Sequence, residues 1–378
     1  MNKQGLVRLR ARPFYQQGMI NMKIGYMAGH ACVRVQKMAL PMMQRGHTIY
    51  MCSQKMPTFA DSYDMYTQAF SLHQLRSWVK VMAGQVDMFH CHNEPTWFVT
   101  LCKESAPDVP VIVDIHDSFL TRVTDEEHKK ALEDGDDVLR ISVEERNNFH
   151  LADALVFPSM PFAEIVIKEY SLQEKPWIVM PSYVPRNLFA YQLNLDWHGG
   201  VVYQGRCDLP ADINDPKKKY YKRGFRYTDM SDFAGQARAL GLQFYIYSRD
   251  DDKFVKHYEN LAALHPPVPY TELMGKIARH DWGLVGNSFY TPQWEIAEPN
   301  KLYEYIAAGV PPVVMYADNS AGIVSEHAIG MVVESVKELK ERWGEHKEFR
   351  KRLLKCREMF MMENHIEDLE TFYKEVLS

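Results

Sequence analysis

The stretch EPNKLYEYIAAGVPPVV, residues 298–314, combines the start of a helix with residues that suit a phosphate. Pro299 fits the first turn of a helix because its missing N–H would have no partner there, and the Gly-Val-Pro-Pro sequence that follows is typical of a helix end. The amides of the next residues, Asn300, Lys301 and Leu302, would lie at the positive end of the helix dipole. We therefore expect an anion-binding site at this helix start.

Glu304 follows that expected anion site by one helical turn. Leu302, Tyr305 and Ile306 fall at helical spacing and should face the core, which leaves Glu304 turned toward the preceding loop. A carboxylate behind a phosphate site can accept hydrogen bonds from ribose hydroxyls, as the acidic residue of dinucleotide-binding folds does. The alternative is a solvated glutamate without a ligand.

Three histidines follow short apolar runs that are typical of strands. His116 follows VPVIVDI and precedes Asp117, whose carboxylate could orient the imidazole at the edge of a cleft. His30 and His92 end similar runs, so three imidazoles could line one rim. The alternative is a zinc site, but the histidines lack the close spacing of zinc ligands, and we predict no metal.

The acidic stretch SRDDDKF, residues 248–254, is a second candidate for a cation site. It lies between an expected strand and an expected helix, where aspartate is an ordinary helix cap. We favour the cap.

Short apolar runs alternate with longer amphipathic stretches along most of the chain, which is typical of strand–helix–strand units in a parallel sheet. The proline-containing stretch PSYVPRNLFAYQLNLDWH interrupts this alternation, which then restarts. The predicted fold is α/β, with doubly wound Rossmann-like domains over 22–185 and 186–360. Residues 1–21 should form a basic extension, and a helix over 361–378 should pack back on the first domain. Ligands should bind in the cleft at the carboxyl ends of the strands.

The composition indicates two soluble globular domains in a chain of 378 residues. No apolar run reaches about 18 residues, so a cytoplasmic location is expected. Six cysteines without paired spacing should be reduced thiols. The first 60 residues contain nine Lys and Arg but no Asp or Glu. Such a segment can bind a polyanion, either an anionic membrane surface or nucleic acid, although an ordinary basic surface is the alternative.

The stretch PNKLYEYIAAGVPPVV resembles the C-terminal signature of glycosyltransferases with the GT-B fold, in particular the retaining family four. VDMFHCHNEPTWFV, PVIVDIHDSF, ADALVFPSMPF, VVYQGR and LMGKIARHDWGLV fit the same template, which covers most of the chain from Met22 to about Val333. The resemblance implies two domains that face each other across a cleft. It further implies that the second domain holds a nucleoside diphosphate sugar and the first holds the acceptor.

The resemblance also implies roles for particular residues. Glu304 would bind the ribose, and the helix start would bind the diphosphate. His116 would contact the donor sugar or phosphate, and Gly205 with Arg206 would grip the diphosphate. The family's second cation is displaced here by the insertion CDLPADINDPKKKYY, which leaves Lys222 and Arg223 as candidates.

The chain departs from the family at two places. A glutamate common in the family is replaced by Ile296, with Glu295 and Glu298 nearby and without an assigned role. The loop after Gly29 keeps one of two usual glycines. We expect this loop to help form the acceptor side, whose candidates are Gly29, His30, His92 and Asp117.

The predicted function is sugar transfer from a nucleoside diphosphate sugar to an acceptor hydroxyl, with retention of configuration. The candidate catalytic residues are His116, Arg206 and Glu304, and no cofactor or metal is expected. The alternatives are a nucleotide-sugar epimerase of the same fold and a binding module without catalysis. The acceptor could be a lipid-linked sugar at an anionic membrane, a polysaccharide or a hydroxylated base in DNA.

Overall fold

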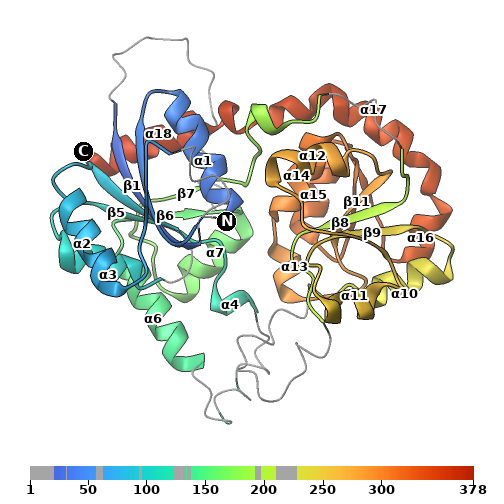
Figure 1. Ribbon diagram of the computed structural model, residues 1–378, viewed down its shortest axis with the longest axis horizontal. Coiled ribbons are helices and arrows are strands. Elements are labelled where there is room, and N and C mark those ends of the chain that lie inside the picture. The colour runs from blue at the N-terminus through green and yellow to red at the C-terminus, as the bar shows by residue number, and fades with distance from the viewer. Residues whose placement is uncertain are drawn as a thin grey trace, which may run out of the picture.

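The computed structural model describes residues 21–30, 32–56, 63–92, 96–122, 129, 133, 138–191, 197–209 and 228–378. Over these residues the chain forms two parallel β-sheets, each covered by helices (Figure 1). The predicted α/β fold with two doubly wound domains is confirmed. Residues 180–200 connect the last strand of the first sheet to the first strand of the second. The exact domain boundaries stay a prediction.

The first sheet has strand order β3-β2-β1-β4-β5-β6-β7 in the described chain. Its strands are β1 (Lys23–His30), β2 (Thr48–Lys55), β3 (Met65–Gln68), β4 (Met88–His92), β5 (Val111–Asp114), β6 (Ala154–Phe157) and β7 (Trp177–Val179). Its helices are α1 (Val33–Gln44), α2 (Leu72–Met82), α3 (Phe98–Ser105), α4 (Phe119–Arg122), α6 (Val138–Leu151) and α7 (Met160–Glu169). The order reverses between β1 and β4, which places a switch point at their carboxyl ends.

The alternation along β1 explains why both faces of this sheet are covered. Ile24, Tyr26 and Ala28 pack in one buried cluster with apolar residues of α1, whereas Met27 packs in another with residues of α2 and α3. Successive side chains of a strand point to opposite faces, so a strand that is apolar throughout must be buried on both sides.

The second sheet has strand order β10-β9-β8-β11-β12-β13 in the described chain. Its strands are β8 (Val201–Gln204), β9 (Phe244–Tyr247), β10 (Ala263–His265), β11 (Trp282–Gly286), β12 (Pro312–Met315) and β13 (Met331–Val332). The helices that accompany it are α10 (Ser231–Ala239), α11 (Asp252–Tyr258), α12 (Tyr270–Ile277), α13 (Pro292–Ile296), α14 (Asn300–Ala308), α15 (Asp318–Glu326), α16 (Val336–Glu341) and α17 (His346–Cys356). Here the switch point lies between β8 and β11.

The last helix, α18 (Ile366–Leu377), returns to the first domain and lies beside α1 (Figure 1). Leu369 and Tyr373 are buried in the same cluster as β1 and α1. Glu370 accepts a hydrogen bond from Arg45 at the end of α1 at 2.6 Å. The predicted return of the C-terminal helix to the first domain is therefore confirmed.

Candidate active site between the two domains

Two cavities meet at the start of α14. The first, which we call the β8 cavity, has a volume of about 370 Å³ and is lined by Gly205 and Arg206 after β8, by Tyr270 and by Glu304. Gly205 has φ +110°, a left-handed conformation that favours glycine and turns the chain sharply at the strand end. The sequence motif Gly205-Arg206 thus lies at the carboxyl end of β8.

The second cavity, which we call the interdomain cavity, has a volume of about 340 Å³. The first domain contributes Cys32, Arg34 and His116 to its lining, and the second contributes Glu298 and Trp294. Pro299, Asn300 and Lys301 line both cavities. A ligand that passes the start of α14 can therefore extend from one cavity into the other.

Glu304 is buried at the contact between the domains, with 2 % of its surface exposed. Its Oε1 accepts hydrogen bonds from Lys37 Nζ of α1 at 2.9 Å and from the Tyr270 hydroxyl at 2.8 Å. Its Oε2 accepts one from the Gln204 side chain. The expected packing of the apolar face is confirmed, since Leu302, Tyr305 and Ile306 are all fully buried. The alternative of a solvated glutamate is wrong.

Lys301 places an ammonium group where the two cavities meet. Its Nζ donates to the Tyr203 hydroxyl at 3.0 Å and lies over the rings of Tyr203 and Trp294. Burial lowers the pKa of Lys301 to about 8, although the charge of Glu304 opposes the shift. The sequence reasoning used only the backbone amide of this residue and missed its side chain.

The predicted set of three amide donors needs one correction. The helix begins at Asn300, as expected, but the Leu302 amide donates to the Pro299 carbonyl at 3.0 Å and is not available to a ligand. This bond forms because the first turn of α14 closes on its own cap residue. The Asn300 side chain also has a partner, since its Oδ1 accepts a hydrogen bond from Lys37 at 2.9 Å.

His116 is oriented by Asp114 rather than by Asp117. Its Nε2 lies 2.6 Å from Asp114 Oδ2, whereas the Asp117 carboxylate accepts a hydrogen bond from Gln293. β5 ends at Asp114 and the chain bends at His116, and the imidazole contacts the carboxylate two residues before it. Arg34 holds Asp114 with three hydrogen bonds, from Nη2 to Oδ1 at 2.8 Å and from Nε to Oδ2 at 3.0 Å and to Oδ1 at 3.2 Å.

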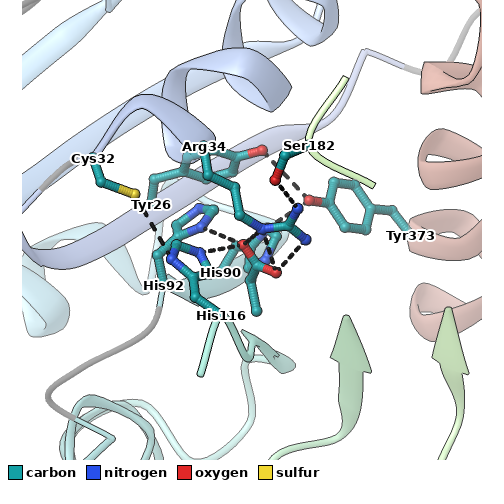
Figure 2. Close-up of polar contacts among 9 residues, drawn as sticks. Tyr26, Cys32, Arg34, His90, His92, His116, Ser182 and Tyr373 are labelled. Carbon is teal, nitrogen blue, oxygen red and sulfur yellow. Dashed lines mark hydrogen bonds and ion pairs between the residues drawn. The ribbon is translucent and has the colours of Figure 1, made fainter. Parts of the chain in front are cut away.

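The charges around Asp114 shift the pKa values of its neighbours. Burial alone would raise the pKa of Asp114, but Arg34 and His116 hold it well below its usual range. Burial alone would likewise lower the pKa of His116, but Asp114 and Cys32 raise it to about 10. His116 therefore carries a proton on both nitrogens at neutral pH. Figure 2 shows His116 between Cys32 and the guanidinium of Arg34.

The predicted rim of three imidazoles does not form. His92 is buried, stacks on His90 with ring centroids 4.2 Å apart and donates to Asp114 Oδ2 at 3.1 Å (Figure 2). His30 ends β1 with an exposed side chain and lines neither of the two cavities, and Gly29 precedes it on the same strand. His92 is buried because β4 lies at the centre of the sheet, where helices cover both faces. Of the three imidazoles, His116 alone lines the interdomain cavity.

His90, His92 and Asp114 bring one nitrogen or oxygen atom each within 4.8 Å of one another in the described part of the chain. Asp114 is already held by Arg34 through three hydrogen bonds, and a cation beside it would be repelled by the guanidinium. We therefore assign no metal to this cluster, and independence from metals stays a prediction.

The other candidate cation site is a helix cap. Asp251 precedes α11, and its side chain accepts a hydrogen bond from the Phe254 amide at 3.2 Å. The predicted capping role is confirmed.

Arg206 lies at the edge of the β8 cavity with about half of its side chain exposed, and it forms an ion pair with Asp208 at 2.6 Å. Lys222 and Arg223 lie outside the described residues, as do residues 1–20 of the basic extension. Within the part of the chain that is described, no helix is long and apolar enough to span a bilayer. All six cysteines are free thiols, as predicted.

Ile296, which stands where the family has a glutamate, joins the buried apolar cluster of the first domain. Its carbonyl accepts a hydrogen bond from the Ser159 hydroxyl of that domain at 3.0 Å. Glu298 lines the interdomain cavity, and its carboxylate accepts hydrogen bonds from Tyr303 and Asn319. Burial raises the pKa of Glu298 to about 7. Glu295 instead contacts the Tyr290 hydroxyl.

Sequence reasoning missed four polar residues that line or brace the cavities: Cys32, Arg34, Lys37 and Asp114. A signal was present for two of them. Arg34 and Lys37 are charged residues three positions apart on an otherwise apolar helix, and such a pair at the buried side implies a partner.

The comparisons with known proteins agree with this architecture. Residues 227–358, about a third of the chain, match the family described as "Glucosyltransferase 3-like, C-terminal domain". No curated protein matches the sequence. Among solved structures, sucrose-phosphate synthase from Thermosynechococcus elongatus superposes with a TM-score of 0.64 at 13% identity, over 94% of this chain and 99% of that one.

Two further solved structures carry ligands. Anabaena HepE in complex with UDP-glucose has a TM-score of 0.63 at 11% identity, over 93% of this chain and 100% of that one. An alpha-glucosyltransferase in complex with UDP and a 13-mer DNA containing a HMU base has a TM-score of 0.55 at 11% identity, over 94% and 99% of the two chains. The predicted resemblance is confirmed: the chain has the two-domain GT-B fold of these glycosyltransferases, and its second domain matches the glucosyltransferase 3-like family.

Proposed function

We propose that the protein is a glycosyltransferase that moves a sugar from a nucleoside diphosphate sugar to an acceptor hydroxyl. The observation that carries the proposal is the junction of the two cavities at Asn300 and Lys301. One cavity contains a buried carboxylate for a ribose, the junction carries a cation and a helix start for a diphosphate, and the other cavity contains His116 between the domains.

The nucleoside would occupy the β8 cavity with its ribose at Glu304. A carboxylate has about four acceptor positions, and three on Glu304 are taken by Lys37, Tyr270 and Gln204. Roughly one position remains for a ribose hydroxyl. Lys37 and its partners thus hold Glu304 in place before the nucleotide arrives.

The diphosphate would lie at the start of α14, beside the ammonium of Lys301 and within reach of Arg206. Negative charge grows on the leaving oxygen as the bond to the sugar breaks, so fixed cations and the helix dipole stabilise the transition state more than the ground state. His116, which is protonated at neutral pH, would add a positive group on the sugar side. In this role it supplies positive charge, because its two ring nitrogens face Asp114 and Cys32, and it does not act as a general base.

The finer parts of the proposal rest on resemblance. The likeness to family four supports retention of configuration, which the anomeric proton coupling of the product would test. The complexes of HepE and of the alpha-glucosyltransferase make UDP-glucose the first donor to test. For the acceptor, the acid-free first 60 residues support a hydroxyl on a polyanionic partner, either a lipid-linked sugar at a membrane or a hydroxylated base in DNA.

Titration calorimetry with UDP tests the donor site. Lys301→Met should weaken UDP binding at least about tenfold, because it removes a buried charge-assisted contact to the diphosphate. Lys337→Met is the matched control, since that lysine is exposed on α16 in the same domain, and UDP affinity should not change. Equal affinity of both variants for UDP would contradict the assignment of the cavity.

Incubation of UDP-glucose without an acceptor separates transfer from epimerisation. A transferase releases only traces of UDP and free glucose, whereas an epimerase converts the sugar while the nucleotide stays attached. The same assay with a chelator tests metal independence. Loss of turnover with EDTA and its recovery with magnesium or manganese would contradict that prediction.

A further inference from the structure

Cys32, His116 and Asp114 form a chain of contacts at the wall of the interdomain cavity. The Cys32 sulfur lies 3.7 Å from His116 Nδ1, and His116 Nε2 lies 2.6 Å from Asp114 Oδ2. Figure 2 shows the Cys32 side chain directed at the His116 ring. A thiol beside an imidazole that is itself oriented by a carboxylate is the arrangement that activates a cysteine.

The surroundings of Cys32 favour its thiolate form. Cys32 immediately precedes α1, a helix of twelve residues, so its side chain lies at the positive end of the helix dipole. Burial alone would raise the pKa of Cys32, but His116 and the amides of Val35 and Arg34 lower it overall. The imidazolium of His116 in turn is held by the buried carboxylate of Asp114.

The remaining titratable groups that face Cys32 do not oppose a thiolate. Burial lowers the pKa of Lys37 on α1, and the charge of Cys32 opposes that shift. Tyr63 and Tyr270 also face the sulfur, and burial raises the pKa of each, so both are neutral at physiological pH. Among the described groups, the charge of His116 lowers the pKa of Cys32 most.

Cys356 provides an internal comparison. It is half-buried, as Cys32 is, but it is the last residue of α17 and donates to the Leu353 carbonyl at 3.7 Å. At this end the helix dipole disfavours a negative charge, and burial raises the pKa of the thiol. The other four cysteines are buried. Cys32 is thus distinguished by its cationic partner and by its place on a cavity wall.

We propose that Cys32 is a modification site at which the thiolate exchanges with low-molecular-weight disulfides. The Cys32 sulfur attacks one sulfur of the disulfide, a new S–S bond forms, the old one breaks, and the second sulfur leaves as a thiolate that takes up a proton from water. The product is a mixed disulfide that projects into a cavity of about 340 Å³. A thiol reductant reverses the reaction.

A consequence for activity rests on the proposed function. A group attached to Cys32 would occupy the space beside His116 where we place the donor sugar. Modification would therefore lower sugar transfer, while UDP, which occupies the β8 cavity, would still bind.

The pH dependence of labelling tests the site in the unmodified full-length protein. A chromogenic aromatic disulfide is added between about pH 6 and 9, and the labelled cysteine is located by mass spectrometry. Because only thiolate reacts, Cys32 should react at least about tenfold faster than Cys356 at pH 6, and its rate should rise less steeply with pH than that of Cys356. The Cys356 rate should rise about tenfold per pH unit over this range. Equal rates, or parallel pH profiles, would overturn the proposal.

Three variants refine the test. Cys32→Ala should abolish the fast reaction and leave the slow one, whereas Cys356→Ser should do the reverse. His116→Gln should slow the Cys32 reaction and make it rise more steeply with pH. Unchanged kinetics in folded His116→Gln protein would overturn the role of the imidazolium.

The two proposals can fail separately. The labelling rates do not depend on any sugar substrate, so a protein that labels as expected but never consumes a nucleotide-sugar would keep the Cys32 site and lose the proposed function. If transfer occurs and the Cys32-modified protein retains full activity, the blocking role is wrong.

Discussion

At the scale of single residues, the ion pair between Lys37 and Glu304 joins the two domains. Both side chains are almost fully buried, and they belong to different domains. A buried charge that loses its partner is strongly destabilising, whereas removal of both charges is often tolerated. The pair therefore contributes to the specificity of the interdomain contact.

Single substitutions at this pair should each lower the free energy of unfolding by about 3–5 kcal/mol, because Lys37→Met leaves Glu304 unpaired and Glu304→Gln leaves Lys37 unpaired. The double variant should lose much less than the sum of the two. Urea unfolding measures all three. Arg76→Met serves as the control, because its ion pair with Glu104 is exposed and should contribute less than about 1 kcal/mol. Additive losses would show that the two charges do not interact.

The double variant also tests the ribose contact without a buried unpaired charge. Its affinity for UDP should fall by about 1–3 kcal/mol relative to the unmodified protein, the usual loss for a hydrogen bond to a charged group. Calorimetry on the folded double variant is the measurement. Unchanged affinity would remove Glu304 from the nucleotide site.

The pKa of Lys301 predicts a pH dependence of diphosphate binding. Burial lowers this pKa to about 8, so the free protein loses the ammonium charge as the pH rises through that value. UDP affinity should fall above about pH 8, by up to tenfold per pH unit. Uridine, which lacks the diphosphate, should show no such dependence, and Lys301→Arg should flatten the UDP profile.

The same shift affects stability with the opposite trend. The folded state binds the Lys301 proton less tightly than the unfolded chain, whose lysine titrates near 10.5. From this group alone, stability should therefore rise between about pH 8 and 10.5, while UDP affinity falls. A loss of UDP affinity between about pH 8 and 10.5 would therefore not result from a loss of stability caused by Lys301.

At the scale of elements, α14 and α18 have different roles. The start of α14 lines both cavities, and its apolar face fixes it in the second domain. α18 lines neither of these two cavities but covers the first sheet beside α1 (Figure 1). It links the end of the chain to the domain that carries Cys32 and His116. Substitutions in α18 should therefore change stability and leave the donor site intact.

Two leucines on α18 provide a matched test of that role. Leu369→Ala should lower the free energy of unfolding by about 2–5 kcal/mol, because a fully buried side chain is replaced by a cavity. Leu377→Ala, on the same helix but 37% exposed, should cost less than about 1 kcal/mol. Thermal and urea unfolding of both variants, with UDP calorimetry at low temperature, separate stability from binding. A similar loss for the two would contradict the observed packing.

At the scale of the whole molecule, the two domains present separate surfaces. The β8 cavity, where we place the donor, is lined mainly by residues of the second domain. Of the first 60 residues, the described β1, α1 and β2 belong to the first domain. We propose that this basic segment brings the acceptor to the cleft, either as a peripheral contact with an anionic membrane or on DNA.

The salt dependence of binding tests this surface. Arg8, Arg10 and Arg12 replaced together by Gln should flatten the loss of binding with rising salt, because each phosphate contact releases counterions. UDP affinity should stay unchanged. Vesicles with anionic lipid and duplex DNA are compared side by side, beginning at about 50 mM salt, where such contacts are strong. If neither binds the unmodified protein, a soluble acceptor becomes the better hypothesis.

The sequence by itself determined the features that depend on local geometry. The strand and helix periods, the Pro299 start and the Gly309 end of α14, and the Asp251 cap all follow from residues within a few positions of one another. For the same reason the apolar face of α14 could be predicted. A resemblance over most of the chain then predicted the arrangement of the domains.

Only the tertiary structure decided which polar groups become partners. Lys37 and Glu304 are 267 positions apart, and no periodic pattern can pair them. His92 looked like a residue at the edge of a cleft, yet the central position of β4 buries it against Asp114 of the neighbouring strand. The physical reason is that the period of an element sets which side a residue faces, whereas the packing of distant elements sets what it meets there.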